Sequence, residues 1–171
     1  MSSRGTNDGG KFVLRGYGQE VATWVASQTA MYHAFVRTKV REGFALLSSG
    51  QLDALTGQFA PDAVFSFPGE HRLGGERRGP QAIREWFVET LRLFPDFEVQ
   101  PHTILVQGGP WRTRVATRFD VLATFPDGAP YRNEGMQLLE LRWGRIHEDR
   151  LFEDTQLIAA ALDRLAELGV R

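Results

Sequence analysis

Arg118 and Asp120 are the first residues of this sequence whose types and spacing suggest chemistry. They stand two positions apart in an expected strand over residues 111–125, so their side chains share one face of it. A neighbouring Arg favours the charged form of an Asp, which is the form that removes a proton from carbon or from water. The guanidinium also stabilises negative charge that develops on a substrate oxygen. The pair therefore assigns Asp120 as a candidate base and Arg118 as its orienting cation.

The face on which this pair lies has two interpretations. The odd positions of the strand are mostly apolar, and the even positions, which include Arg118 and Asp120, are mostly polar. If the odd face forms the core, the pair is a surface ion pair worth at most about 1 kcal/mol. If the even face lines a pocket, the two side chains are reactive groups.

The next expected strand, over residues 131–143, carries two amides on an otherwise apolar face. Asn133 and Gln137 share the parity of Leu139 and Leu141, so this face is expected to point inward. A few polar groups among many apolar ones are typical of a ligand pocket. We take Asn133 and Gln137 as candidate substrate-binding residues; the alternative is that both amides only satisfy neighbouring backbone groups.

The last expected strand, over residues 145–152, offers further carboxylates. Asp149 and Glu153 share the parity of Leu151, so an inward face would make either of them a possible acid. The competing interpretation is a charge-rich, solvated strand end. Asp154 stands just before the final helix and is expected to be its N-cap.

Composition excludes several classes of function. Lys and Arg number 20 against 21 Asp and Glu, so no net positive field recruits nucleic acid or an anionic membrane. There is no cysteine, and none of the four histidines has a metal-binding spacing, so we expect no metal and no cofactor. No stretch is long and apolar enough to span a membrane, and we expect a cytoplasmic protein.

The periodicity predicts helices first and then a meander of strands. Residues 1–18 are rich in glycine and are expected to form a flexible tail, followed by a single domain over residues 19–171. Helical spacing covers residues 19–47, 51–59, 80–94 and 155–168, and strands are expected over residues 63–67, 97–107, 111–125, 131–143 and 145–152. This order predicts an α+β fold, a curved antiparallel sheet with helices on one side. A strongly curled sheet of this kind encloses a cone, and Trp86 of the third helix is a candidate to line it.

Several short segments resemble limonene-1,2-epoxide hydrolases and the related SnoaL-like polyketide cyclases, members of the nuclear transport factor 2-like superfamily, which also includes the ketosteroid isomerases. They are residues 118–122, 125–128, 144–146 and 152–154, with residues 59–63 and 79–83 as two further matches. The resemblance implies a cone-shaped sheet with helices on its concave side, a lipophilic small-molecule substrate and a homodimer. The N-terminal helix predicted here is extra to that fold. It also implies that Arg118 and Asp120 point into the pocket, with the apolar face of their strand turned outward to a partner subunit.

The departures from these families are as informative as the matches. The second Asp of the hydrolases falls on Leu151, and the hydrolase Tyr and Asn that hold the attacking water fall on Phe65 and Phe67. The ketosteroid isomerase residues fall on Phe67, Gly43 and Gln137. None of these mechanisms is complete, and Phe65, Phe67 and Leu151 become candidate substrate contacts instead.

Three functions remain open. The first is a cofactor-free acid/base enzyme, a cyclase, isomerase or hydrolase, that acts on a lipophilic oxygenated molecule with Asp120 as base. A single acid/base group fits isomerisation or aldol-type ring closure better than epoxide opening, which needs a separate acid. The second is a binding protein that keeps the pocket without the chemistry. The third is a dimerising module, which predicts a filled cone.

Overall fold

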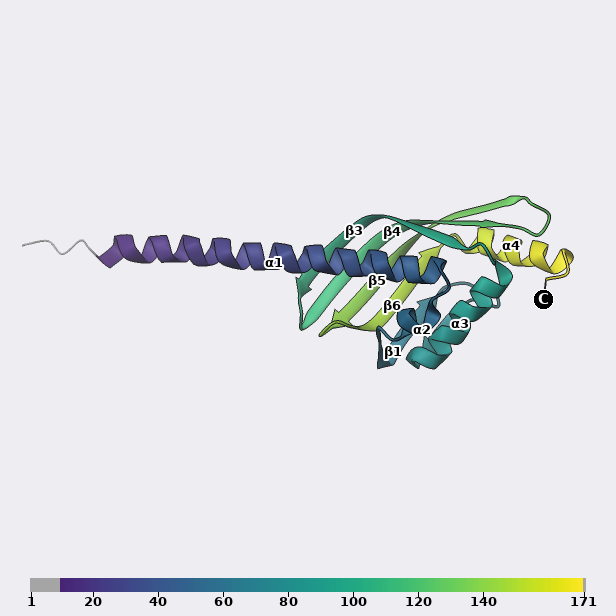
Figure 1. The fold of residues 1–171 in the computed structure, drawn as a ribbon, viewed down its shortest axis with the longest axis horizontal. Helices are drawn as coiled ribbons and strands as arrows, with labels where there is room; N and C mark the ends of the chain where they lie inside the picture. The colour runs from purple at the N-terminus through teal and green to yellow at the C-terminus, as the bar shows by residue number, and fades with distance from the viewer. Residues whose placement is uncertain (1–9, 171) are drawn as a thin grey trace, which may run out of the picture.

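In the part of the chain that the structure describes, six strands form one curled sheet. The computed structural model describes residues 10–170, with side chains for Gln19 and for residues 21–170. The strands are β1 (Phe59–Phe67), β2 (Gly75–Arg78), β3 (Glu98–Gly109), β4 (Arg112–Thr124), β5 (Pro130–Arg142) and β6 (Arg145–Glu153). They lie in the order β2-β1-β6-β5-β4-β3, and the sheet curls without closing (Figure 1).

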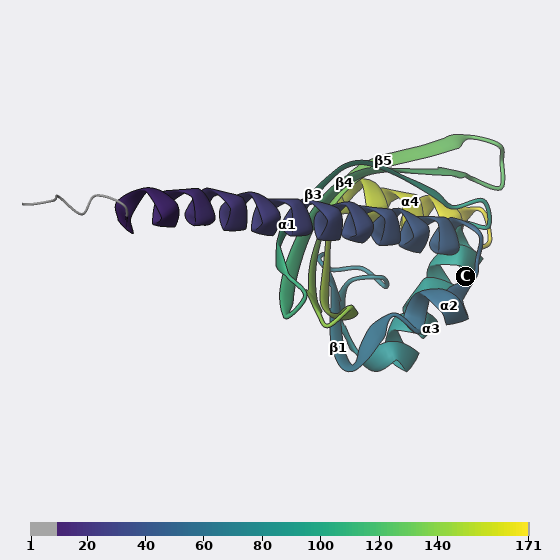
Figure 2. The same cartoon turned by 60° about the vertical axis from the view of Figure 1, so that its left-hand side comes forward.

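Helices cover the open side of the sheet. They are α1 (Gly10–Ser48), α2 (Leu52–Thr56), α3 (Gly79–Leu93) and α4 (Thr155–Glu167). Figure 2 shows α1 across the hollow of the sheet, with α2 and α3 on the other side of that hollow. Two hydrogen bonds hold α1 to the β3–β4 hairpin: Tyr32 shares one of 2.5 Å with Thr113, and His33 Nε2 lies 2.8 Å from the Gly108 carbonyl oxygen. These two contacts hold α1 across the concave face of the sheet.

The odd-numbered positions of β4 and β5 face the interior. Phe119 is 2% exposed and Val121 is 1% exposed. Phe119 pairs across the sheet with Gly135, and Gly135 pairs with Glu153 of β6. Since cross-strand partners share a face, the inward face of β6 also carries odd-numbered residues. This register decides which candidate residues reach the interior.

The order and type of the elements agree with the sequence, apart from three differences. A further strand, β2, forms over Gly75–Arg78, outside the predicted strand ranges. β1 starts at Phe59 instead of residue 63. The sheet is not wholly antiparallel, because β1 pairs with β6 in parallel. No hairpin joins β1 to β6, so turn geometry does not dictate their relative direction.

The N-terminal tail predicted over residues 1–18 overlaps the first helix. α1 begins at Gly10, so residues 10–18 belong to that helix. The rest of the predicted tail, residues 1–9, lies outside the described residues. The single domain over residues 19–171 stays a prediction of the sequence.

Candidate active site

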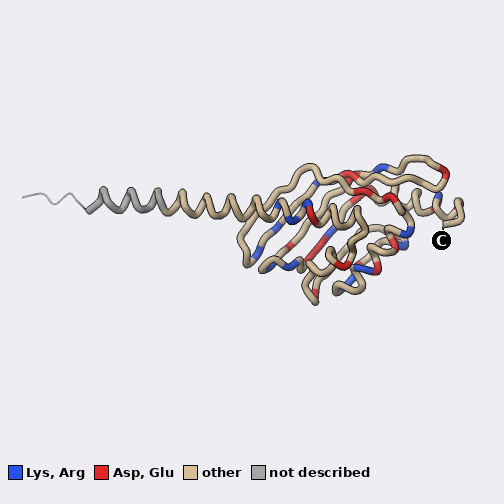
Figure 3. Tube along the Cα trace, viewed as in Figure 1, with Lys and Arg blue, Asp and Glu red and all other residues tan. Residues whose placement is uncertain are grey.

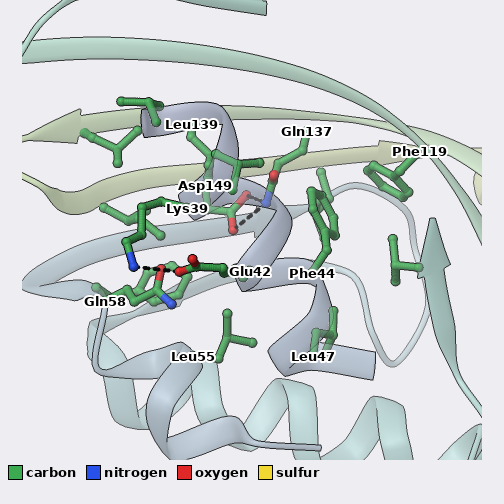
Figure 4. Close-up of a pocket in the computed structure, with 18 of the residues that line it drawn as sticks. Lys39, Glu42, Phe44, Leu47, Leu55, Gln58, Phe119, Gln137, Leu139 and Asp149 are labelled. Atoms are coloured by element: carbon green, nitrogen blue, oxygen red, sulfur yellow. Dashed lines mark hydrogen bonds and ion pairs between the residues drawn. The ribbon is translucent and has the colours of Figure 1, made fainter. Parts of the chain in front are cut away.

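A cavity of about 460 Å³ lies between the concave face of the sheet and α1 (Figure 4). Its wall is mostly apolar, and the aromatic side chains in it are Tyr32, Phe35, Phe44, Phe59, Trp86, Phe87, Phe97 and Phe119. A few polar groups interrupt this wall. The size and lining suit a lipophilic small molecule that is oriented by a small number of hydrogen bonds.

Asp149 and Gln137 form the polar centre of the cavity wall. The amide nitrogen of Gln137 donates to both carboxylate oxygens of Asp149, at 3.0 and 3.1 Å. Asp149 is 3% exposed, and its neighbours in the wall are apolar, among them Leu139 and Leu151. The pair therefore places one ionisable group, the Asp149 carboxyl, in the cavity wall, where it is held by a hydrogen-bond donor and is otherwise surrounded by apolar side chains.

Burial gives Asp149 the acidity of a general acid or base. Loss of hydration raises the pKa of Asp149 to about 7, and the hydrogen bond from Gln137 opposes part of that rise. A carboxyl group with this pKa is populated in both protonation states near neutral pH. It can accept a proton from a substrate and return it at another atom.

Glu153 is a second buried carboxyl group in the same wall. Desolvation raises its pKa to about 7. It lies over Gly135, where a Cβ would stand 2.8 Å from Glu153 Cγ and 2.5 Å from Phe119 Cζ. Asn133 donates to Glu153 Oε2 at 3.3 Å. The missing side chain at position 135 thus makes the space through which Glu153 reaches the cavity.

One polar atom at the centre is left without a partner. The carbonyl oxygen of the Gln137 side chain is buried and has no hydrogen-bond partner among the described residues. The Gln137 nitrogen is already used by Asp149. A substrate hydroxyl, or the protonated oxygen of an enol, is the complementary group for this acceptor. The arrangement therefore offers one proton acceptor and one hydrogen-bond acceptor side by side.

The side of the cavity lined by α1 carries an ion pair. Lys39 and Glu42 lie one helical turn apart, with Nζ and Oε2 at 2.6 Å, and both are about half exposed. Figure 4 shows Gln58 beside them, and Asp149 is buried in the same cavity wall. Phe35 lines the same region and is 58% exposed, which marks it as a part of the opening.

The prediction that Arg118 and Asp120 point into the pocket is wrong. Both lie on the outer face of β4, because Phe119 between them points inward. Arg118 pairs with Glu134 at 2.8 Å and is 54% exposed, and the Asp120 carboxylate lies 3.1 Å from His102 Nε2. The apolar odd face is the inner one, so the expectation that it meets a partner subunit is wrong as well.

The other predicted site residues divide between the cavity and the core. Trp86, Gln137, Leu151, Asp149 and Glu153 line the cavity. Three do not: Phe65 and Phe67 pack against Trp86 from behind, with ring centroids 4.5 and 5.3 Å from it, and Asn133 is buried between Tyr131 and Glu153.

Sequence reasoning missed the contribution of α1 to the site. Tyr32, Phe35, Lys39 and Glu42 line the cavity, yet their helical spacing only indicated a helix packed on a core. The spacing of Asp149 and Glu153 was visible, but their charge-rich neighbours favoured a solvated strand end. The signal that identifies Glu153 is Gly135, because the absence of a side chain there makes room for the Glu153 side chain. The sequence alone does not show that the two residues are neighbours, since this depends on the register between β5 and β6.

No group of metal-ligating side chains is found among the described residues. Within the same part of the chain, no helix has the length and apolar content needed to cross a bilayer.

The curled sheet, the helical roof and the apolar cavity together define an α+β protein of the nuclear transport factor 2-like class. Residues 40–148 match the SnoaL-like domain family, a span that covers more than half of the chain. The protein therefore belongs to the SnoaL-like domain family. No curated protein matches the chain.

Solved structures support the same placement. IdmH, a candidate polyketide cyclase from Streptomyces antibioticus, is 27% identical with a TM-score of 0.57, over 70% of this chain and 92% of its own. A candidate polyketide cyclase from Sinorhizobium meliloti is also 27% identical with a TM-score of 0.51, over 64% of this chain and 88% of its own. Bal32a, from a soil-derived mobile gene cassette, is 24% identical with a TM-score of 0.61, over 78% and 96%. The fold is thus shared with proteins described as candidate polyketide cyclases.

Proposed function

We propose that the protein is a cofactor-free acid/base enzyme that isomerises or cyclises a lipophilic, oxygenated small molecule. The observation that carries this proposal is the buried Asp149 carboxyl group, which is held by Gln137 in an apolar cavity. Asp149 takes the role of base that was predicted for Asp120. The two candidate polyketide cyclases at 27% identity support ring closure as the reaction class.

The proposed reaction begins at a carbon next to a substrate carbonyl. Asp149 in its carboxylate form takes the proton, so a C–H bond breaks and an O–H bond forms on Asp149. The electron pair moves to the carbonyl oxygen as an enolate. In an isomerisation, Asp149 returns the proton at another carbon. In an aldol-type closure, the enolate carbon attacks a second carbonyl carbon, and the new alkoxide takes a proton from Glu153 or Asp149.

Hydrogen exchange tests the first step directly. In D₂O, the protein should accelerate deuterium incorporation next to the carbonyl of aromatic ketones such as tetralone, measured by NMR. Asp149→Asn should lower this rate by about 100-fold or more, since general acid/base groups contribute on the order of 10²–10⁴. Asp120→Asn is the matched control and should leave the rate within about twofold. Equal rates in the wild type and Asp149→Asn would remove Asp149 from the mechanism.

A non-catalytic binding protein is the second candidate. Leu151, Phe65 and Phe67 stand where the related enzymes hold catalytic groups, and this favours a pocket that binds without turnover. Tight binding of the aromatic ketones by calorimetry, with no exchange for any of them, would favour this candidate. The dimerising module with a filled cone is disfavoured, because the cone holds a cavity of about 460 Å³.

A homodimer is the proposed assembly. Exposed apolar side chains gather on α1, namely Val21, Trp24, Val25, Met31 and Phe35. A second set, Leu105, Met136, Leu138 and Phe152, is exposed on the outer face of the sheet. Large exposed apolar areas are typical of protein interfaces. The cytoplasmic location stays a prediction of the sequence.

A further inference from the structure

One stretch of α1, most of it beyond the sheet, carries no charged side chain. Residues 21–36 contain no Asp, Glu, Lys or Arg, and the tan tube of this stretch in Figure 3 carries no blue or red. Trp24 is 63% exposed, Met31 62%, and Val21 and Phe35 are each 58% exposed. A helix in water normally turns charged residues outward, so this surface lacks its partner.

The exposed apolar residues of this stretch lie on one face of α1, together with the polar Gln28 and the partly buried Tyr32. Val21, Val25, Gln28, Tyr32 and Phe35 follow each other at spacings of four and three, with Trp24 and Met31 beside them. We call these seven residues the arm stripe. Phe35 lines the opening of the cavity, so the arm stripe faces the same side of the helix as that opening.

The arm stripe is symmetric in sequence about Gln28. Positions at equal distances on either side of it carry matching apolar types: Val25 with Met31, Trp24 with Tyr32, and Val21 with Phe35. A two-fold symmetric contact between identical copies requires such a match. If residue i of the first copy contacts residue j of the second, then residue j of the first copy also contacts residue i of the second. Two antiparallel helices with a two-fold axis at Gln28 satisfy it along the whole stripe.

The available area is sufficient for a stable pair. The five apolar side chains of the arm stripe that are about half exposed or more present roughly 600 Å² per copy. Mutual burial would remove about 1,200 Å² in total, which reaches the range of specific interfaces. The uncharged surface carries no charge repulsion against a second copy of itself.

We propose that the arm stripe is the homodimer interface, formed by two antiparallel α1 helices that cross at Gln28. This inference rests on the homodimer proposed above and is independent of the role of Asp149. In this pair, Val21 of the partner subunit lies against Phe35. Each copy therefore places the beginning of its α1 next to the cavity opening of the other.

Solution mass tests the surface. The full chain should be a dimer by light scattering after gel filtration, and Trp24→Glu should shift it to monomer, because two charges would be buried in the pair. Ala30→Glu is the matched control, an exposed position on the other side of the same helix turn, and should remain dimeric. Circular dichroism confirms that both variants keep their helix content.

Cross-linking tests the axis. The chain has no cysteine, so any disulfide between two copies must form at the single cysteine that is introduced. Gln28→Cys should form a disulfide-linked dimer under mild oxidation, because the two-fold axis brings the two positions together. Val21→Cys should not, because 14 residues of helix separate the two copies of that position by about 21 Å. Equal cross-linking at both positions would indicate a parallel pair and overturn the arrangement.

Other outcomes separate the homodimer from its proposed interface. A monomeric wild type overturns both. A dimer that survives Trp24→Glu but is lost in Leu138→Glu assigns the interface to the outer sheet face and overturns the arm stripe. A monomer that binds phosphatidylcholine/phosphatidylglycerol vesicles through Trp24 assigns the stripe to a membrane surface, and this too contradicts the proposal.

Discussion

Asp149 of β6 and Gln137 of β5 are diagonal neighbours across the sheet, and a single amide nitrogen serves both carboxylate oxygens at 3.0 and 3.1 Å. In the register, Gln137 pairs with Leu151 and Asp149 pairs with Leu139. Each polar side chain therefore has a leucine directly opposite it. The contact orients the carboxyl group of Asp149 and opposes part of the rise in pKa that burial causes.

Substitution of Gln137 should change the pH dependence of activity. The carboxylate form of Asp149 is the active base, so the rate of ketone exchange should rise with pH to a plateau above about 7. The hydrogen bond from Gln137 lowers this pKa, so Gln137→Leu should move the midpoint to higher pH. Gln107→Leu, on the exposed outer face of β3, should leave the midpoint in place. An unshifted midpoint in Gln137→Leu would separate the amide from the reacting group.

Asp149 should also make the fold less stable as the pH rises. Its pKa is about 7 in the folded state and about 3.8 when unperturbed, so the folded state holds the proton more tightly. Its contribution to stability is therefore fully present below about pH 4, falls between about pH 4 and 7, and is constant above. Asp149→Asn removes this decline. From about pH 5 to about pH 8, the unfolding free energy of the wild type should fall by roughly 2–3 kcal/mol relative to the variant.

This comparison is measured by urea unfolding at several pH values. Glu153 also has a pKa of about 7 and contributes a similar decline in both proteins, so the difference between them isolates Asp149. Parallel stability profiles for the wild type and Asp149→Asn would mean that the carboxyl group is not desolvated in the folded protein.

A methyl group at position 135 should destabilise the fold and disturb the cavity. The added Cβ of Gly135→Ala would stand 2.5 Å from Phe119 Cζ and 2.8 Å from Glu153 Cγ, so at least one side chain must move. Overpacking of this kind costs about 1–3 kcal/mol. Urea unfolding should show that loss of unfolding free energy. Gly128→Ala is the control for backbone strain, because Gly128 has a φ of +84° in a turn and a Cβ there would meet no other atom. A Gly135→Ala protein as stable as the wild type would contradict the close contact.

The start of α4 should depend on Asp154. Its carboxylate accepts hydrogen bonds from the backbone amides of Gln156 and Leu157, at 3.0 and 3.2 Å, as an N-cap does. Asp154→Ala should cost about 1 kcal/mol of unfolding free energy, and Asp154→Ser should restore most of it. An equal loss in both variants would assign the effect to something other than the cap.

Much of the fold was predictable, because the signals for it are local. The turns at residues 108–110 and 126–128, the helical spacing in residues 80–94 and the cap at Asp154 are each read from a few neighbouring residues. The parallel pairing of β1 with β6 was not, since about 80 residues separate the two strands and no hairpin fixes their direction.

The candidate site was predictable only in part, because alternation shows that a strand has two faces but not which face is inside. For β4, the apolar odd positions correctly indicated the face that packs on the core. The resemblance to the epoxide hydrolases wrongly predicted that Arg118 and Asp120, on the even face, point into the pocket. For β6, charged residues on both faces left Asp149 ambiguous. Only the register with β5, which sets Asp149 beside Gln137, resolves it.

One unbroken helix covers the cavity and continues far beyond the sheet, and this makes α1 a lever. Val21 lies about 22 Å along the axis from Val36, where the helix becomes buried, so a tilt of about 5° over the cavity displaces Val21 by about 2 Å. A molecule that lifts this cover on entry must therefore alter whatever holds the far end. Because such coupling is reciprocal, a partner that binds the N-terminal end of α1 must change the affinity of the cavity for that molecule.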